Sequence, residues 1–215
     1  MILINPSCMR FCFPWILWKG PSDRREIVLT FDDGPHPVYT PETIDILNLY
    51  RAKAVFFLNG QDVLLHPGIV EKLKNAGHIL ATHGFTHRKL DFQRRSRIVE
   101  EMESGMCAVG KIAGKRPGFF RPPYGRFDLR FRRILRHANL KMVLWSLLTC
   151  DFRETEPETL VRTVRDRIHN GAILVFHDGH PNAPVMLKAL PDILRTVHRL
   201  DFRIASLDDW AGGMP

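Results

Sequence analysis

The sequence predicts an α/β fold, because short β-branched or aromatic runs alternate with helix-period segments beyond residue 25. Its 215 residues, of which 45% are hydrophobic and 25% charged, have the composition of a globular domain and suffice to bury a large core. The sequence contains no linker, low-complexity tract or fixed-period repeat. A single domain over residues 26–215 is therefore expected, preceded by an apolar arm of residues 1–25 that packs on it.

Seven strands are expected, each a short apolar run followed by turn residues or polar groups. No G-x-G-x-x-G or G-x-x-x-x-G-K-[ST] motif follows any of these runs, so a nucleotide-binding sheet is not supported. The alternative is a barrel of parallel strands, short of the usual strand number. The expected strands are Ile27–Phe31, Ala54–Leu58, His78–Ala81, Gly118–Arg121, Met142–Trp145, Ile173–Phe176 and Phe202–Ala205.

About six helices fall between these strands. Pro41 suits the first position of one helix with Thr40 as its N-cap, and Gly77 lies just past the end of the next. Leu160 and Val164 share one face of a later helix. The expected helices are Pro41–Tyr50, Pro67–Ala76, Arg95–Ile112, Asp128–Ala138, Pro157–His169 and Pro184–Arg199.

The charge balance is strongly basic, with 31 Lys and Arg against 23 Asp and Glu and a net charge of +8. This balance favours anionic surroundings, although an arginine-rich solvated surface is the simpler interpretation. The run from Arg126 to Arg136 is typical of an amphipathic helix whose Phe127, Phe131 and Leu135 point inward. No basic motif with interleaved aromatic residues indicates nucleic-acid binding, so no nucleic-acid partner is expected.

The N-terminal segment Met1–Gly20 is apolar and aromatic but does not match a secretory signal peptide, because Arg10 and Pro14 interrupt it and no small-residue cleavage site follows. We interpret it as an arm packed on the domain. A peripheral membrane-surface patch is the alternative, since Phe11 and Trp15 are interfacial residue types. No apolar run approaches the length of a membrane span, and four irregularly spaced cysteines do not suggest a disulfide framework. A location in the cytoplasm or at the periphery of the inner membrane is expected.

Polar groups suited to catalysis follow five of the seven expected strands, at the end where parallel barrels place their active sites. His83 and His87 have a spacing that lets two imidazoles converge on a metal, and a carboxylate from another strand end would leave positions open for water. Taken alone, Asp32–Asp33 is equally explained by a turn, and one His-x-x-x-His pair among ten histidines is usually coincidental. The candidate groups are Asp32, Asp33, His83, His87, Arg121, Tyr124, Asp151, His177 and Asp178.

Five motifs occur in order: TFDDGP, H-x-x-x-H, RPPYG, a Trp followed six residues later by an Asp, and a strand ending in HD. Together, from about Ile27 to Leu207, they resemble the polysaccharide deacetylase family, also called the family-four carbohydrate esterases. The resemblance implies a distorted parallel (β/α) barrel with about seven strands. It also implies a divalent metal and hydrolysis of N-acetyl groups on aminosugars.

The resemblance implies roles for eight residues. Zinc is the metal expected, although cobalt, nickel and iron suit two imidazoles and a carboxylate nearly as well. The implied roles are metal ligation by Asp33, His83 and His87, proton abstraction by Asp32, orientation of that base by Arg121, oxyanion stabilisation by the Tyr124 backbone N–H, and proton donation by His177 tuned by Asp151.

The chain departs from the family pattern near the substrate. Val175 stands in the place of a usual Leu, Leu148 in that of a frequent Asp, and Phe152 in that of a frequent Trp, while Gly84 replaces a common Ser or Thr. The motifs therefore specify the reaction more closely than they specify the substrate.

The function expected is metal-dependent removal of N-acetyl groups from an aminosugar glycan such as a chitin oligomer or peptidoglycan, with no obligate protein partner. One alternative is a deacylase or deformylase acting on a lipid-linked sugar at the membrane surface. The other is a catalytically inactive, basic glycan-binding barrel, although the complete set of candidate residues argues against it.

Overall fold

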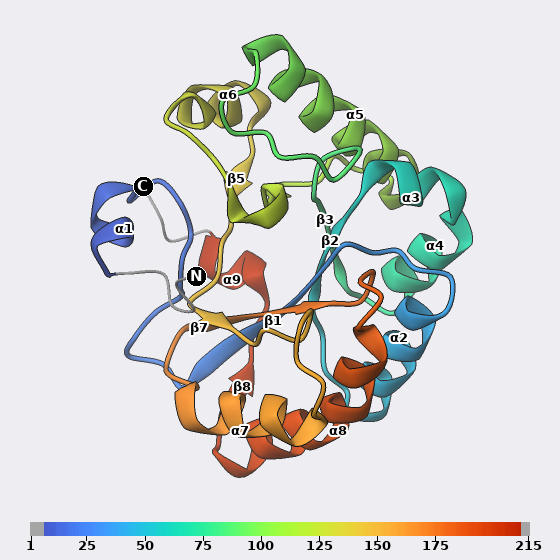
Figure 1. Ribbon diagram of the computed structural model, residues 1–215, viewed down its shortest axis with the longest axis vertical. Coiled ribbons are helices and arrows are strands. Elements are labelled where there is room, and N and C mark those ends of the chain that lie inside the picture. Colours follow the sequence, from blue (N-terminus) through green and yellow to red (C-terminus); the bar gives the residue numbers. More distant parts are fainter. Residues whose placement is uncertain (1–6, 212–215) are drawn as a thin grey trace.

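A parallel sheet surrounded by helices forms the centre of the molecule (Figure 1). The computed structural model describes residues 7–211, so residues 1–6 of the expected arm and residues 212–215 of the expected domain lie outside it. The strands are β1 Glu26–Asp32, β2 Val55–Leu58, β3 Ile79–Thr82, β4 Phe119–Phe120, β5 Lys141–Met142, β6 Leu147–Leu148, β7 Ala172–His177 and β8 Arg203–Ile204. The helices are α1 Ser7–Cys12, α2 Tyr39–Leu49, α3 Gly60–Leu65, α4 Pro67–Asn75, α5 Arg95–Ala113, η1 Pro123–Gly125, α6 Arg130–Ala138, α7 Pro157–Arg167, α8 Ala183–Arg199 and α9 Leu207–Ala211.

Every strand pair is parallel, and the order across the sheet is β5-β4-β3-β2-β1-β7-β6, with β8 beside the start of β1. The two strands at the ends of this order, β5 and β6, belong to one stretch of chain. Met142 pairs with Phe120 of β4, and Leu148 pairs with Val175 of β7. One segment thus brings the two edges of the sheet together and curls it into a distorted barrel. The predicted fold class is confirmed.

The expected strand Met142–Trp145 is wrong in its bounds, because the chain there forms two short strands, and the stretch between them belongs to neither. Arg121 accounts for the break. Its Nε donates to the carbonyl oxygen of Val143 at 3.1 Å, and its Nη2 donates to that of Leu144 at 3.2 Å. A buried guanidinium therefore occupies carbonyl groups that would otherwise pair with a neighbouring strand.

Alternate residues of the central strand face two different apolar layers, which is why its sequence is an almost continuous apolar run. Ile27, Leu29 and Phe31 pack in the layer between the sheet and helices such as α8. Val28 packs with Val55, Phe57 and Ile173 in a second cluster that also contains Leu207 and Trp210 around α9. Because these strands are buried on both faces, they are accessible mainly at their ends. The polar groups of the site lie at those ends.

The N-terminal segment lies against the flank of the barrel that is furthest from α2, α3 and α4 (Figure 1). Leu17 forms a parallel bridge with Val143, and Ile16, Leu17 and Trp18 are buried. The indole nitrogen of Trp18 donates to the Phe13 carbonyl oxygen at 3.0 Å. None of the helices among residues 7–211 combines the length and apolarity that crossing a bilayer requires.

Thr40 is not the N-cap of its helix, contrary to expectation, because α2 begins earlier, at Tyr39. The Thr40 hydroxyl accepts a hydrogen bond from the His36 backbone N–H at 2.8 Å and donates one to the buried carboxyl of Asp178. A long-range partner therefore replaces the local cap. Helix α3 was also not expected; it is only six residues long and follows β2 almost directly.

Candidate active site

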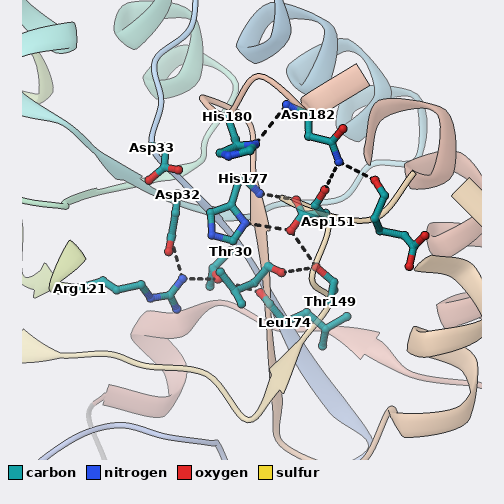
Figure 2. Close-up of polar contacts among 12 residues, drawn as sticks. Thr30, Asp32, Asp33, Arg121, Thr149, Asp151, Leu174, His177, His180 and Asn182 are labelled. Carbon is teal, nitrogen blue, oxygen red and sulfur yellow. Dashed lines mark hydrogen bonds and ion pairs between the residues drawn. The ribbon is translucent and has the colours of Figure 1, made fainter. Parts of the chain in front are cut away.

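A cleft of about 670 Å³ opens at the carboxyl ends of the parallel strands. Its walls bring together side chains from segments that are far apart in the sequence, and Figure 2 shows several of them converging. Arg121 and Asp151 lie behind the lining residues and contact them from below the surface of the cleft. The lining includes Asp32, Asp33, Asn59, His83, His87, Tyr124, Trp145, Leu148, Phe152, His177 and His180.

Asp33, His83 and His87 form a compact group in which one ligand atom from each lies within 4.8 Å of the other two. The Nε2 atom of His87 lies 2.9 Å from Asp33 Oδ1, and that of His83 lies 3.5 Å from the same oxygen. Asp33 and His87 both have left-handed backbone conformations, with φ of 72° and 54°. Asp and His tolerate this conformation better than most residues, and it turns the chain sharply at the ends of the strands.

The donor set fits a divalent cation. Asp33 Oδ1 is buried and accepts no hydrogen bond, although two imidazole nitrogens approach it. His83 Nδ1 lies 2.7 Å from the backbone carbonyl oxygen of Arg121, which can only accept, so the proton is on Nδ1 and the Nε2 lone pair faces Asp33. Burial lowers the pKa of His83 to about 4, so its imidazole is neutral at pH 7.

The charge of Asp33 is also suited to a cation. Burial by itself would raise the pKa of this carboxyl, but the close contact with His87 and the charges of His177, His83 and His87 hold it well below its usual range. A charged carboxylate between two imidazoles, with one ring held by a backbone carbonyl, is a ligand set with room for further ligands.

Asp32 is paired with an arginine that is completely buried. Arg121 Nη1 donates to Asp32 Oδ1 and to Thr30 Oγ1, both at 2.7 Å. Thr30 in turn donates to the Leu174 carbonyl oxygen of β7, so its hydroxyl is oriented to accept from the guanidinium (Figure 2). A buried guanidinium requires a counterion, and Asp32 is that counterion. The pair fixes Asp32 at the wall of the cleft in one orientation.

His177 is held by Asp151 through two contacts. Its Nδ1 lies 2.9 Å from Asp151 Oδ1, and its backbone N–H donates to Asp151 Oδ2 at 2.7 Å. Thr149 donates to the same carboxylate at 3.1 Å (Figure 2). Burial by itself would lower the pKa of His177, but the charge and hydrogen bond of Asp151, with smaller contributions from Asp33 and Asp32, raise it to about 9.

Tyr124 lies at the mouth of the cleft with a left-handed backbone (φ 61°) and a half-exposed side chain. Its ring lies 4.7 Å from the ring of His87 between centroids. Beyond it, the apolar part of the cleft consists of Trp145, Leu148 and Phe152. Leu148 packs on the buried Val175, two of the positions at which the sequence departs from the family pattern. This side of the cleft suits a small apolar group.

Several residues that support the site could not be identified from the sequence alone. Glu101 of α5 is buried, and its carboxylate accepts hydrogen bonds from the backbone N–H groups of Phe85 and Thr86 and from the Thr86 hydroxyl, at 2.8 to 3.2 Å. It therefore holds the segment between His83 and His87. It lies 14 residues beyond His87 inside a charged helix, where nothing in the sequence distinguishes it from a solvated acid.

Two further supports are Asn182, which the sequence did not reveal, and Asp178, which was a candidate group for acid–base chemistry beside His177. The side-chain amide of Asn182 donates to the backbone carbonyl oxygens of Asp151, at 2.5 Å, and Glu154, at 2.6 Å (Figure 2). Asp178 is fully buried beside Gly34 and bonded by Thr40. Burial raises the pKa of Asp178 to about 7, against the effect of the Thr40 hydrogen bond.

Comparison with known proteins connects this geometry to a family. The sequence profile described as "Polysaccharide deacetylase" matches residues 19–143. A peptidoglycan-N-acetylglucosamine deacetylase of Bacillus cereus is 31% identical over 78% of this chain, which spans 64% of that relative's length. A chitooligosaccharide deacetylase of Azorhizobium caulinodans is 31% identical over 74% of this chain and 77% of its own length. A solved structure of a peptidoglycan N-acetylglucosamine deacetylase, with a bound benzamide compound, superposes with a TM-score of 0.91 at 26% identity over 94% of this chain and 96% of its own.

Proposed function

The chain belongs to the polysaccharide deacetylase family, and on that premise we propose that it is a metal-dependent carbohydrate N-deacetylase. The observation that carries the proposal is the placement of the Asp33, His83 and His87 group in one cleft with Asp32 and His177. Asp32 and His177 are register partners at the ends of β1 and β7. Groups able to accept and to donate a proton therefore lie side by side next to the metal-binding group.

Asp33, His83 and His87 would hold the cation, and zinc is the metal we propose, since it accepts this donor set in catalytic sites. A divalent cation bound there would lower the pKa of a coordinated water and polarise the acyl carbonyl. The protein contributes the orientation of the ligands, through the Arg121 carbonyl behind His83 and the Glu101 carboxylate behind the segment that ends at His87.

Asp32 is the base that we assign to the attacking water. Its carboxylate is held by Arg121 on one oxygen and lines the cleft. It accepts one proton of the water as the oxygen attacks the acyl carbon. General bases placed in this way contribute roughly 10²- to 10⁴-fold to the rate.

The remaining steps fall to Tyr124 and His177. The Tyr124 backbone N–H is the donor that we assign to the oxyanion, because the left-handed turn places Tyr124 at the mouth of the cleft. His177 gives its proton to the nitrogen of the breaking C–N bond, so that acetate and a free amine are released. Its raised pKa keeps it protonated at neutral pH, as that role requires.

We propose N-acetylated aminosugar polymers as substrates, with peptidoglycan and chitin oligomers first. The relatives at 31% identity are named for these two glycans. An acetyl methyl group fits the apolar side of the cleft formed by Trp145, Leu148 and Phe152. A long polymer needs an open cleft at the molecular surface rather than an enclosed cavity, and the side chains of His87 and Tyr124 are accessible there.

The test is acetate release from peptidoglycan fragments and chitin oligomers, with added zinc or cobalt and with a chelator. Release that the chelator abolishes and zinc restores is expected. Asp32→Asn should release acetate at least about a hundred times more slowly while binding as much metal as the native chain. Acetate release that survives complete metal removal would overturn the proposal, and so would an Asp32→Asn variant of full activity.

A further inference from the structure

A second cavity, of about 390 Å³, lies between the N-terminal segment and α6, away from the catalytic cleft. Its walls combine an apolar floor with a basic rim. We call it the arm pocket. The apolar part is formed by Pro14, Trp15, Leu17, Leu135, Leu140 and Met142, and the polar rim by Arg132, Arg136, Asn139 and Lys141.

Two arginines of the rim have no acidic partner in the part of the chain that the structure describes. Arg132 and Arg136 are one helical turn apart on the exposed side of α6. No carboxylate of residues 7–211 pairs with either of them, whereas Asp128 at the start of the helix is occupied by Arg130. Two guanidinium groups beside Lys141 leave a concentrated positive charge at the mouth of an apolar pocket.

Two exposed apolar side chains lie three residues before lining residues of the arm pocket, Phe11 before Pro14 and Leu129 before Arg132. Leu129, which directly precedes α6, is 74% exposed, and Phe11 of α1 is 88% exposed. The pocket floor and these side chains offer contacts to hydrocarbon, while the rim offers contacts to a negative charge. The chemistry that satisfies both is an amphiphile with an anionic head.

We propose that the arm pocket binds the headgroup of an anionic phospholipid and holds the protein on a membrane surface. The lipid phosphate lies against Arg132 and Arg136, and the adjoining glycerol and upper acyl chain cover the accessible apolar lining at Pro14 and Trp15. A free phosphate ion would satisfy the rim alone and leave the floor in water, which is why a lipid is the better occupant.

The position of the arm pocket also indicates which substrates a docked protein reaches. Lys141 and Met142 form β5, and the lining residues Asn139 and Leu140 directly precede it, so the pocket extends past the amino end of that strand. The catalytic cleft lies at the carboxyl ends of the parallel strands. A bilayer at the arm pocket therefore leaves the cleft accessible to a polymer in solution, which favours a glycan over a lipid-linked sugar.

The experiment is co-sedimentation of the full chain with phosphatidylglycerol-containing vesicles and with pure phosphatidylcholine vesicles. We expect binding to the anionic vesicles alone and its loss at high salt. Each basic residue near an anionic surface contributes about 1 kcal/mol, or about fivefold, so Arg132→Gln with Arg136→Gln should weaken binding by about 30-fold. The matched control is Arg162→Gln with Arg165→Gln on exposed positions of α7, which makes the same change of net charge.

Three results would overturn the proposal. One is that the native protein does not bind anionic vesicles at low salt. Another is equal loss of binding in the α6 and α7 variants, which would mean that net charge alone causes the attraction. The last is that inorganic phosphate releases much more protein from the vesicles than chloride does at the same ionic strength. The site would then be one for a free anion. Acetate release from a soluble glycan checks that each variant is folded and stays at the native level if the arm pocket is separate from catalysis.

Discussion

His83 is buried and His177 is mostly buried, each at the end of a parallel strand, and both line the catalytic cleft, yet their environments drive their pKa values in opposite directions. The Nδ1 atom of His83 lies 2.7 Å from a neutral backbone carbonyl, whereas that of His177 lies 2.9 Å from the Asp151 carboxylate. The pKa values are about 4 and about 9. The group behind a histidine, rather than its depth, thus separates an imidazole suited to a metal from one suited to donating a proton.

The largest predicted effect separates these two roles directly. His83→Ala and His177→Ala should each lower the rate of acetate release by roughly 10³-fold, because metal-based charge stabilisation and protonation of the leaving amine are each worth several kcal/mol. Only His83→Ala should also lose bound metal, as measured by atomic emission on the dialysed protein. Full metal content in His83→Ala would contradict the assignment of His83 as a metal ligand. Loss of metal in His177→Ala would mean that His177 also helps to bind the metal.

Asp151→Asn tests the comparison next, since it gives His177 a neutral partner like that of His83. An acid must be protonated to act, so activity falls as pH rises through the pKa of His177. Removing the charge of Asp151 should move this alkaline limb of kcat/KM to lower pH by about 1 to 3 units. A cation bound at Asp33 would cancel part of the effect of the Asp33 charge on His177. Asp151 is then the main cause of the raised pKa of His177. An unchanged alkaline limb, at native metal content, would remove Asp151 from the mechanism.

A smaller effect is expected when the support of the metal-binding half is weakened. Glu101→Gln keeps the size of the side chain but removes the charge that accepts from Phe85 and Thr86. Metal affinity should fall by about 10- to 100-fold, while kcat at saturating metal returns close to the native value. The control is Glu103→Gln, an exposed acid on the same helix that pairs with Arg116. Equal metal affinities in the two variants would reduce Glu101 to a purely structural role.

The sequence predicted the catalytic face more completely than the supports behind it. Asp33, His83 and His177 follow strands whose apolar runs are unmistakable, so their convergence follows from the parallel arrangement alone. Arg121 interrupting a strand, Thr40 bonding Asp178 instead of capping α2, and Glu101 beneath the metal-binding segment all depend on contacts between distant parts of the chain. Local sequence patterns carry no information about such contacts, and the pKa values of the histidines depend on them.

The smallest effect on catalysis, and a clear one on stability, is expected at Asp178, which follows His177 in the chain but is buried without a cationic partner among residues 7–211. Its pKa is raised from 3.8 to about 7, so the folded protein keeps a proton that the unfolded chain has already lost. The stability from this group is therefore complete below pH 3.8 and is lost as pH rises toward 7. Asp178→Asn should flatten this part of the pH dependence of Tm and raise Tm relative to the native chain above pH 7, with little change in acetate release. Asp208→Asn, at an exposed position, is the control, and identical Tm profiles for the native chain and Asp178→Asn would mean that Asp178 is charged in the folded protein.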